Sequence, residues 1–189
     1  MIAVRCRYGL LISAPMTTPG TPPAPMYSAD EKQTLHASLD RHRDAVLWKL
    51  EGLDDERLRR PMTPTGTSLL GLVKHLAAVE YGWFVETFGG RAEPLWFDPY
   101  DDMRITAEET TEQIIAFYGR ARSAADTMIT ELPLDTQGRP AWRDITVSLR
   151  WTLVHMVEET ARHAGHMDIL RELIDGTTGD HPPAGGTTG

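Results

Sequence analysis

The chain has 189 residues, a formal net charge of −8 and a single cysteine, Cys6. This length suffices for one domain with a buried core. The negative charge argues against a protein that binds nucleic-acid backbones or anionic membranes, and a lone cysteine excludes an internal disulfide framework and a cysteine-rich metal site. No apolar run approaches the roughly 20 residues that span a bilayer, and a reducing, cytoplasmic setting is expected.

Both ends of the chain have the composition of unstructured segments. Residues 1–27 contain the Pro-rich stretch MTTPGTPPAPM, preceded by a short apolar run that loosely imitates a signal peptide. We interpret this segment as a disordered leader, in which Met16 or Met26 are alternative translation starts. Residues 179–189 read as a disordered tail. The folded unit is therefore expected at residues 28–178.

The first two helices are predicted from caps and from apolar residues spaced three or four apart. The first begins at Ser28, which forms a capping box with Glu31, and its apolar stripe, Leu35 to Leu53, contains a histidine. The second begins with Thr67 or Ser68 as N-cap, carries an inner face that runs from Leu69 to Trp83, and stops at Gly89–Gly90.

The last two helices follow the same logic. The third is expected to begin at a capping box of Thr106 and Glu109, and the fourth to begin at Ser148 and end before Gly176. Only the stretch DITVSL alternates as a strand does. The pattern predicts an all-α fold, a four-helix bundle whose long Pro- and aromatic-containing connections can roof a pocket at one end.

Polar residues interrupt the apolar faces of two of these helices. Glu159 and His163 lie one turn apart, about 40° around the fourth helix, so that their side chains can converge on one point. His75 lies between apolar residues of the second helix, and His42 has an equivalent position in the first. Two ligands from one helix and a third from another would suit Zn²⁺, Ni²⁺ or Fe²⁺ and leave a coordination position open, as in catalytic sites. The alternative is a set of hydrogen-bonded core residues, and spacing does not choose between His75 and His42 as the third ligand.

Three blocks carry a family resemblance: LWKLEGLDDERLRRP, GTSLLGLVKHLAAVE and SLRWTLVHMVEETARHAGHMDILRELIDG. In this order they resemble an actinobacterial branch of the DinB superfamily over residues 28 to 178. The resemblance implies a DinB/YfiT-type four-helix bundle with up-down-down-up topology. It also implies a divalent metal held by His75, Glu159 and His163, with Glu159 at a position where many members have histidine. Mycothiol-dependent maleylpyruvate isomerases are similar in using a glutamate there.

The resemblance also implies a chemistry. Relatives use mycothiol or another low-molecular-weight thiol as cosubstrate, and a metal with an open position favours the nucleophilic thiolate. The sterol-carrier-like domain of the isomerases has no counterpart here, so we expect S-transfer to an electrophilic small molecule rather than isomerisation. The alternatives are a non-catalytic, stress-associated metal-binding bundle and a metal-dependent hydrolase. Homodimers occur among the relatives and are expected here.

Several further residues have weaker assignments. His42 is interpreted as a proton carrier or a support for the metal ligands, or else as a buried, hydrogen-bonded histidine. Arg150, at the start of the fourth helix, is a candidate for binding an anionic part of the cosubstrate. His155 and His166 are expected at the edge of the pocket or on the surface. Trp83, Trp96 and Trp142 are expected to pack in the core or the loops.

Overall fold

The computed structural model describes residues 29–181, and the leader predicted at 1–27 and residues 182–189 of the predicted tail lie outside them. Within this part of the chain, no helix is long and apolar enough to cross a membrane. The elements are α1 (Glu31–Trp48), α2 (Asp55–Arg59), α3 (Leu69–Glu80), the π-helical turn η1 (Tyr81–Val85), the 3-10 turn η2 (Glu86–Phe88), α4 (Thr111–Glu131), the short strands β1 (Gln137–Gly138) and β2 (Val147–Ser148), and α5 (Leu149–Asp175).

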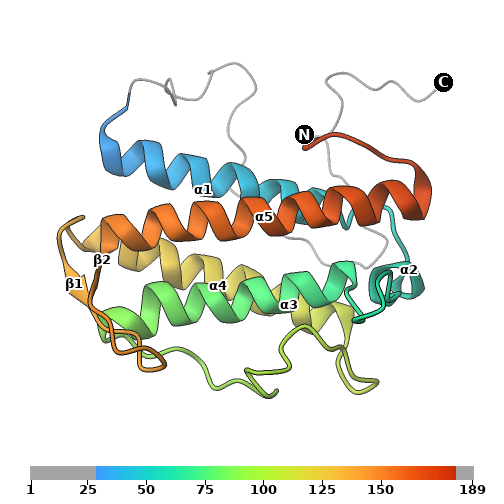
Figure 1. Ribbon diagram of the computed structural model, residues 1–189, viewed down its shortest axis with the longest axis horizontal. Helices are drawn as coiled ribbons and strands as arrows, with labels where there is room; N and C mark the ends of the chain where they lie inside the picture. The colour runs from blue at the N-terminus through green and yellow to red at the C-terminus, as the bar shows by residue number, and fades with distance from the viewer. Residues whose placement is uncertain (1–28, 182–189) are drawn as a thin grey trace, which may run out of the picture.

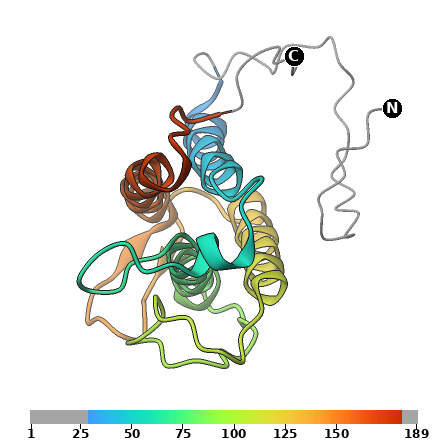
Figure 2. The ribbon, with the colours of Figure 1, turned by 90° about the vertical axis from the view of Figure 1, so that its right-hand side faces the viewer.

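The four long helices form the predicted bundle with the predicted up-down-down-up topology. In Figure 1, α1 and α5 run side by side in one direction, and α3 and α4 run in the other. An ion pair between Arg150 and Glu31 joins the starts of α5 and α1, and Arg171 binds the backbone oxygen of Lys49 at their ends. Viewed along its long axis, the bundle places one helix at each of four corners around the core (Figure 2).

Apolar side chains from all four helices fill the centre. Val46 of α1, Leu76 of α3, Phe117 of α4 and Met167 of α5 are fully buried in one continuous cluster. Full burial of such a side chain contributes about 1.5–3 kcal/mol each, and this is the main source of cohesion between the helices. A second cluster lies toward the β1–β2 hairpin and contains Trp83.

Most predicted helix ends are confirmed. The side chains of Ser68 and Ser148 accept hydrogen bonds from the first turns of α3 and α5. Gly89 and Gly176 end their helical segments with positive φ values of 80° and 78°, a conformation that glycine adopts without steric cost. The first helix is capped by Asp30, and Ser28 lies outside the described residues.

The predicted start of the third long helix is wrong by several residues. Glu109 accepts the expected capping-box hydrogen bond from the backbone of Thr106, yet the helix begins only after Thr110. The reason is that the ammonium of Lys74 on α3 and the indole of Trp96 both bind Oε1 of Glu109. These two contacts hold Glu109 in the loop that packs on α3. The short helix α2 was not anticipated, and the strand suggested by DITVSL is limited to β2.

Candidate metal centre

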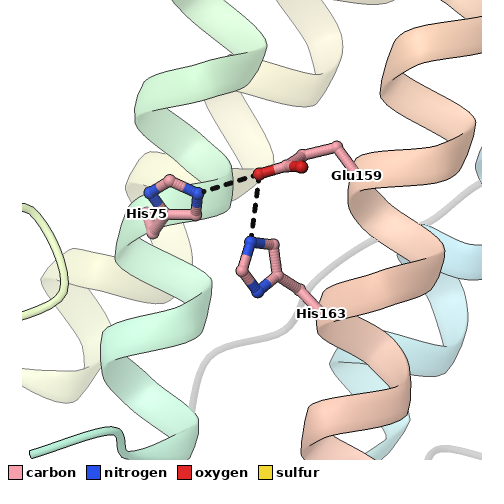
Figure 3. Close-up of side chains that lie close together, drawn as sticks. All are labelled: His75, Glu159 and His163. Atoms are coloured by element: carbon pink, nitrogen blue, oxygen red, sulfur yellow. Dashed lines mark hydrogen bonds and ion pairs between the residues drawn. The ribbon is translucent and has the colours of Figure 1, made fainter. Parts of the chain in front are cut away.

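Three of the predicted ligands meet between α3 and α5. These helices are antiparallel neighbours, so His75 from the middle of α3 faces Glu159 and His163, which are one turn apart on α5 (Figure 3). Oε1 of Glu159 lies 3.3 Å from Nε2 of His75 and 3.1 Å from Nε2 of His163. The three ligand atoms all lie within 4.8 Å of one another.

The separations suit a small divalent cation. Metal–ligand bonds of about 2.0–2.1 Å in tetrahedral geometry place the ligand atoms about 3.3 Å apart. The two distances from the Glu159 carboxylate, 3.3 and 3.1 Å, already match this spacing. The three side chains retain some exposure, 15% for His75, 19% for Glu159 and 8% for His163. The triad is therefore not sealed from solvent, and two imidazoles with one carboxylate are a donor set that fits the implied metal.

Asp102 fixes the orientation of His75. Nδ1 of His75 lies 2.8 Å from Oδ2 of Asp102, and because a carboxylate can only accept, the proton is on Nδ1. The lone pair of the neutral ring is then on Nε2, which points to Glu159 and His163. Burial of His75 opposes its charged form, but the hydrogen bond and charge of Asp102 prevail and raise its pKa. A carboxylate behind a ligating histidine is the usual support of a metal site.

The other two candidate ligands, His163 and Glu159, both have lowered pKa values. Burial, together with the neighbouring His75, lowers the pKa of His163 and favours the neutral ring that a metal requires. Nδ1 of His163 is 3.4 Å from Nδ1 of His166. Burial alone would raise the pKa of Glu159, but the adjacent rings of His75 and His163 outweigh this and lower it. The carboxylate is thus ionised at neutral pH, which lets it offset the charge of a bound cation.

The loop that carries Asp102 is fastened directly to α3. A Cβ on Gly71 would lie only 2.2 Å from the backbone oxygen of Met103, so the close approach depends on glycine. One turn later, Lys74 donates to the backbone oxygen of Arg104. These contacts place Asp102 over the outer edge of His75. Spacing along the sequence carried no signal for it, since nothing in the DPYDDMR stretch tells which helix its aspartates approach.

Comparison with known proteins identifies the family of the chain. A family model described as "Mycothiol-S-transferase" matches residues 34–176. The chain belongs to the mycothiol S-transferase family. This confirms the resemblance to the DinB group, in which this family lies. The conserved protein of a locus from Enterococcus faecalis shares the fold, with a TM-score of 0.56 at 15% identity over 79% of this chain and 100% of that one. The comparison with curated proteins yields no match.

Two further candidate residues, His42 and Arg150, do not join the triad of His75, Glu159 and His163. His42 is half-buried on α1, where burial and then Arg41 lower its pKa, and none of the hydrogen bonds found within residues 29–181 joins it to His75, Glu159 or His163. Arg150 lies at the hairpin end of the bundle and pairs there with Glu31 and Asp135. Arg150 is therefore remote from the ligand atoms, and His42 makes no hydrogen bond to them in the part of the chain that the structure describes.

A second group of potential ligands, His36, Asp40 and Asp126, lies between α1 and α4. Its negative charge is already balanced, because Nη1 of Arg43 is 2.8 Å from Asp40 and 2.7 Å from Asp126. A divalent ion there would have to displace a guanidinium that is fully buried. The group is thus an ion-pair network that joins two helices, and the triad is the better metal site.

Proposed function

We propose that this protein is a metal-dependent S-transferase that joins mycothiol, or a similar low-molecular-weight thiol, to an electrophilic small molecule. The observation that carries the proposal is the convergence of His75, Glu159 and His163 in a chain of the mycothiol S-transferase family. Three protein ligands leave room for one exogenous group, and this distinguishes catalytic from structural sites.

The roles of the residues follow from their contacts. A bound divalent metal would supply Lewis acidity, which lowers the pKa of a thiol and so increases the thiolate fraction at neutral pH. His75 and His163 would hold it through their Nε2 atoms, and Glu159 would add a compensating negative charge. Asp102 keeps His75 in the tautomer that presents Nε2. In this proposal, thiol and acceptor both approach the triad from its partly exposed edge.

The proposed reaction is a nucleophilic substitution. The thiolate sulfur forms a bond to an electrophilic carbon, and the leaving group departs from that carbon with the bonding electron pair. The thiol proton passes to solvent, so no oxidant or reductant is consumed. The nucleophilic sulfur comes from the cosubstrate, so the mechanism requires no cysteine of the protein.

The test is a conjugation assay with purified full-length protein reloaded with Zn²⁺ or Ni²⁺. We expect metal-dependent conjugation of mycothiol to monobromobimane, and its loss in His75→Ala, which removes a ligand. His36→Ala is the matched control, because this histidine belongs to the Arg43 network on α1 and should leave the rate unchanged. A wild-type rate no greater than that of His75→Ala would refute the transferase. Turnover of esters or amides without thiol would indicate a hydrolase, and metal binding without turnover a non-catalytic bundle.

Three finer features belong to the proposal through the resemblance of the sequence alone: Zn²⁺ as the native metal, a homodimer and a cytoplasmic location. The first is tested by metal analysis of protein purified without added metal, with the Glu159→Ala and His163→Ala variants as metal-free references. The dimer is tested by light scattering after gel filtration, where a mass near the 21.1 kDa of one chain would refute it.

A further inference from the structure

An aromatic surface continues the seam between α3 and α5 beyond the triad. Trp83 of η1 is 5% exposed and lies at its centre. Its ring centroid is 4.5 Å from that of His155, 5.5 Å from that of Trp151 and 5.3 Å from that of Trp142. Because α3 and α5 are antiparallel, Trp83 faces His155 and Trp151 just as His75 faces Glu159 and His163.

The two outer rings of this surface remain open to solvent. Trp142 is 45% and Trp151 43% exposed, although each packs against Trp83. Trp151 also stacks on His155, with an interplanar angle of 12° and centroids 5.0 Å apart. Burial is the main cause that lowers the pKa of His155, so its ring is neutral at pH 7. The result is a layered set of uncharged planar rings whose outer members present surface to a ligand.

The local backbone is adapted to this arrangement. After Glu80, α3 widens into the π-helical turn η1, a rare form that often occurs at functional sites. The ring of Trp142, which comes from the β1–β2 connection, lies where a side chain at position 82 would be: a Cβ on Gly82 would be 2.9 Å from its Cη2 atom. A glycine and a helical irregularity thus bring a tryptophan from a distant segment onto the end of α3.

The position of this surface relates it to the proposed reaction. His155 precedes Glu159 by one helical turn, about 6 Å along α5. One or two fused aromatic rings span that distance, so a ring that packs near His155 can place an electrophilic carbon at the triad. Mycothiol, in contrast, must approach with its sulfur at the metal ligands themselves.

We propose that Trp142, Trp151 and His155 form the acceptor subsite, and that the acceptor is an uncharged electrophile with a planar aromatic body. This inference rests on the proposed function for the transfer step, in which a carbon–sulfur bond forms and the leaving group departs with its electron pair. The binding of the aromatic body requires only the rings, whose stacking and edge-on contacts favour other π-systems. The subsite selects the acceptor and leaves the thiol site unaffected.

The kinetic test compares two acceptors with the metal-loaded protein. For monobromobimane, whose planar body has two fused rings, Trp151→Ala should raise KM roughly three- to ten-fold, the loss expected for one aromatic contact. Iodoacetamide has no ring, and mycothiol binds elsewhere in this proposal. For both of these compounds, KM of the variant should stay within about two-fold of the wild-type value. Trp48→Ala, at the far end of α1, is the matched control. An equal rise of KM for both acceptors, or a rise confined to mycothiol, would overturn the assignment.

A binding test separates this inference from the proposed function. Unreactive 1,3-dinitrobenzene is titrated into ¹⁵N-labelled full-length protein without thiol, and the five tryptophan indole signals are followed, assigned through Trp→Phe variants. We expect saturable shifts for Trp142 and Trp151, while Trp96, whose indole is bonded to Glu109, serves as the internal reference. Saturable shifts without any thiol transfer would retain the aromatic site and reject the transferase. Absent or uniform shifts would reject the aromatic site even if transfer occurs.

Discussion

His75 donates a hydrogen bond from Nδ1 to Oδ2 of Asp102 over 2.8 Å, which leaves Nε2 as the atom that faces Glu159 and His163. We predict that Asp102→Asn weakens Zn²⁺ binding by about 10- to 100-fold, the usual loss when such a supporting carboxylate is removed. An asparagine can donate to Nδ1 and stabilise the opposite tautomer, in which Nε2 carries the proton and cannot bind a metal. Competition with a chromophoric chelator measures the affinity.

The neighbouring Asp101 provides the control for this prediction. It lies in the same loop, pairs with Arg104 at the surface and has the same charge. Asp101→Asn should therefore leave the Zn²⁺ affinity unchanged. Equal affinities for Asp102→Asn and Asp101→Asn would mean that the hydrogen bond to His75 does not orient the ligand.

Gly71→Ala is predicted to disturb the same support from the side of α3. The added Cβ would lie 2.2 Å from the backbone oxygen of Met103, so the loop must move and carry Asp102 with it. We expect a loss of about 1–3 kcal/mol in the free energy of unfolding, as for other overpacked sites, together with weaker Zn²⁺ binding. Urea denaturation and the chelator assay measure the two effects.

Gly119→Ala is the matched substitution on α4, where a Cβ would meet nothing within 4 Å. Alanine is a better helix former than glycine, so we expect this variant to be more stable by up to about 1 kcal/mol with unchanged metal affinity. If Gly71→Ala is as stable as wild type, the close packing of the loop on α3 is wrong.

Local signals in the sequence predicted the framework well. N-caps such as Ser68 and Ser148 and terminal glycines such as Gly176 act within a few residues, so their effect can be read without knowing the fold. Glu159 and His163 were identified for the same reason, since one turn of helix fixes their relation. The choice of His75 over other histidines required the resemblance, because spacing within a helix says nothing about which helices are neighbours.

Features that depend on contacts between distant segments were missed. Glu109 has the spacing of a capping box, but it also pairs with Lys74, which is 35 positions away in the sequence. This distant contact overrides the local signal. The apolar residues from Leu69 to Trp83 are spaced three or four apart, as in an ordinary α-helix, so they carry no signal for the π-helical turn at Tyr81–Val85. Asp102 belongs to an irregular loop, for which no periodic pattern exists.

The buried pair of Arg43 and Glu80 is predicted to be needed for stability. Their side chains are 0% and 1% exposed, and two hydrogen bonds of 2.7 and 2.5 Å connect them. Glu80→Ala leaves the buried guanidinium with only Asp40 and Asp126, and should cost about 3 kcal/mol in the free energy of unfolding. Urea denaturation measures the loss.

The double substitution Arg43→Met with Glu80→Leu tests whether the cost arises from an uncompensated charge. Apolar residues of similar volume remove both buried charges together, while Asp40 and Asp126, which also lose Arg43, are 39% and 40% exposed and can be solvated. The double variant should therefore be more stable than Glu80→Ala alone. A double variant that is less stable than the single one would show instead that the network around Arg43 contributes favourably by itself.

Asp175 is predicted to make the stability of the bundle depend on pH in the acid range. Burial opposes ionisation of this carboxyl, but hydrogen bonds with Arg171 and Thr177 prevail and lower its pKa to about 2, from an ordinary 3.8. Because the pKa is depressed in the folded state, the stabilisation is fully present above pH 3.8 and is lost as the pH falls toward 2. Arg171 also binds the backbone oxygens of Lys49 and Glu51, so the pair fastens the ends of α1 and α5.

Asp175→Asn should therefore lower Tm at pH 7, and the difference from wild type should begin to shrink below about pH 4, where the carboxyl of the unfolded chain starts to bind protons. Thermal unfolding followed by circular dichroism from pH 7 to pH 3 measures both curves. Glu172→Gln, an exposed charge change in the same turn of α5, should give a much smaller difference at pH 7. A deficit of Asp175→Asn that stays constant down to pH 3 would show that the ionised carboxylate is not what fastens the two helices. Below pH 3.8 the unfolded wild-type chain binds a proton that the folded chain does not, so part of the charge-dependent stabilisation must already be lost at pH 3.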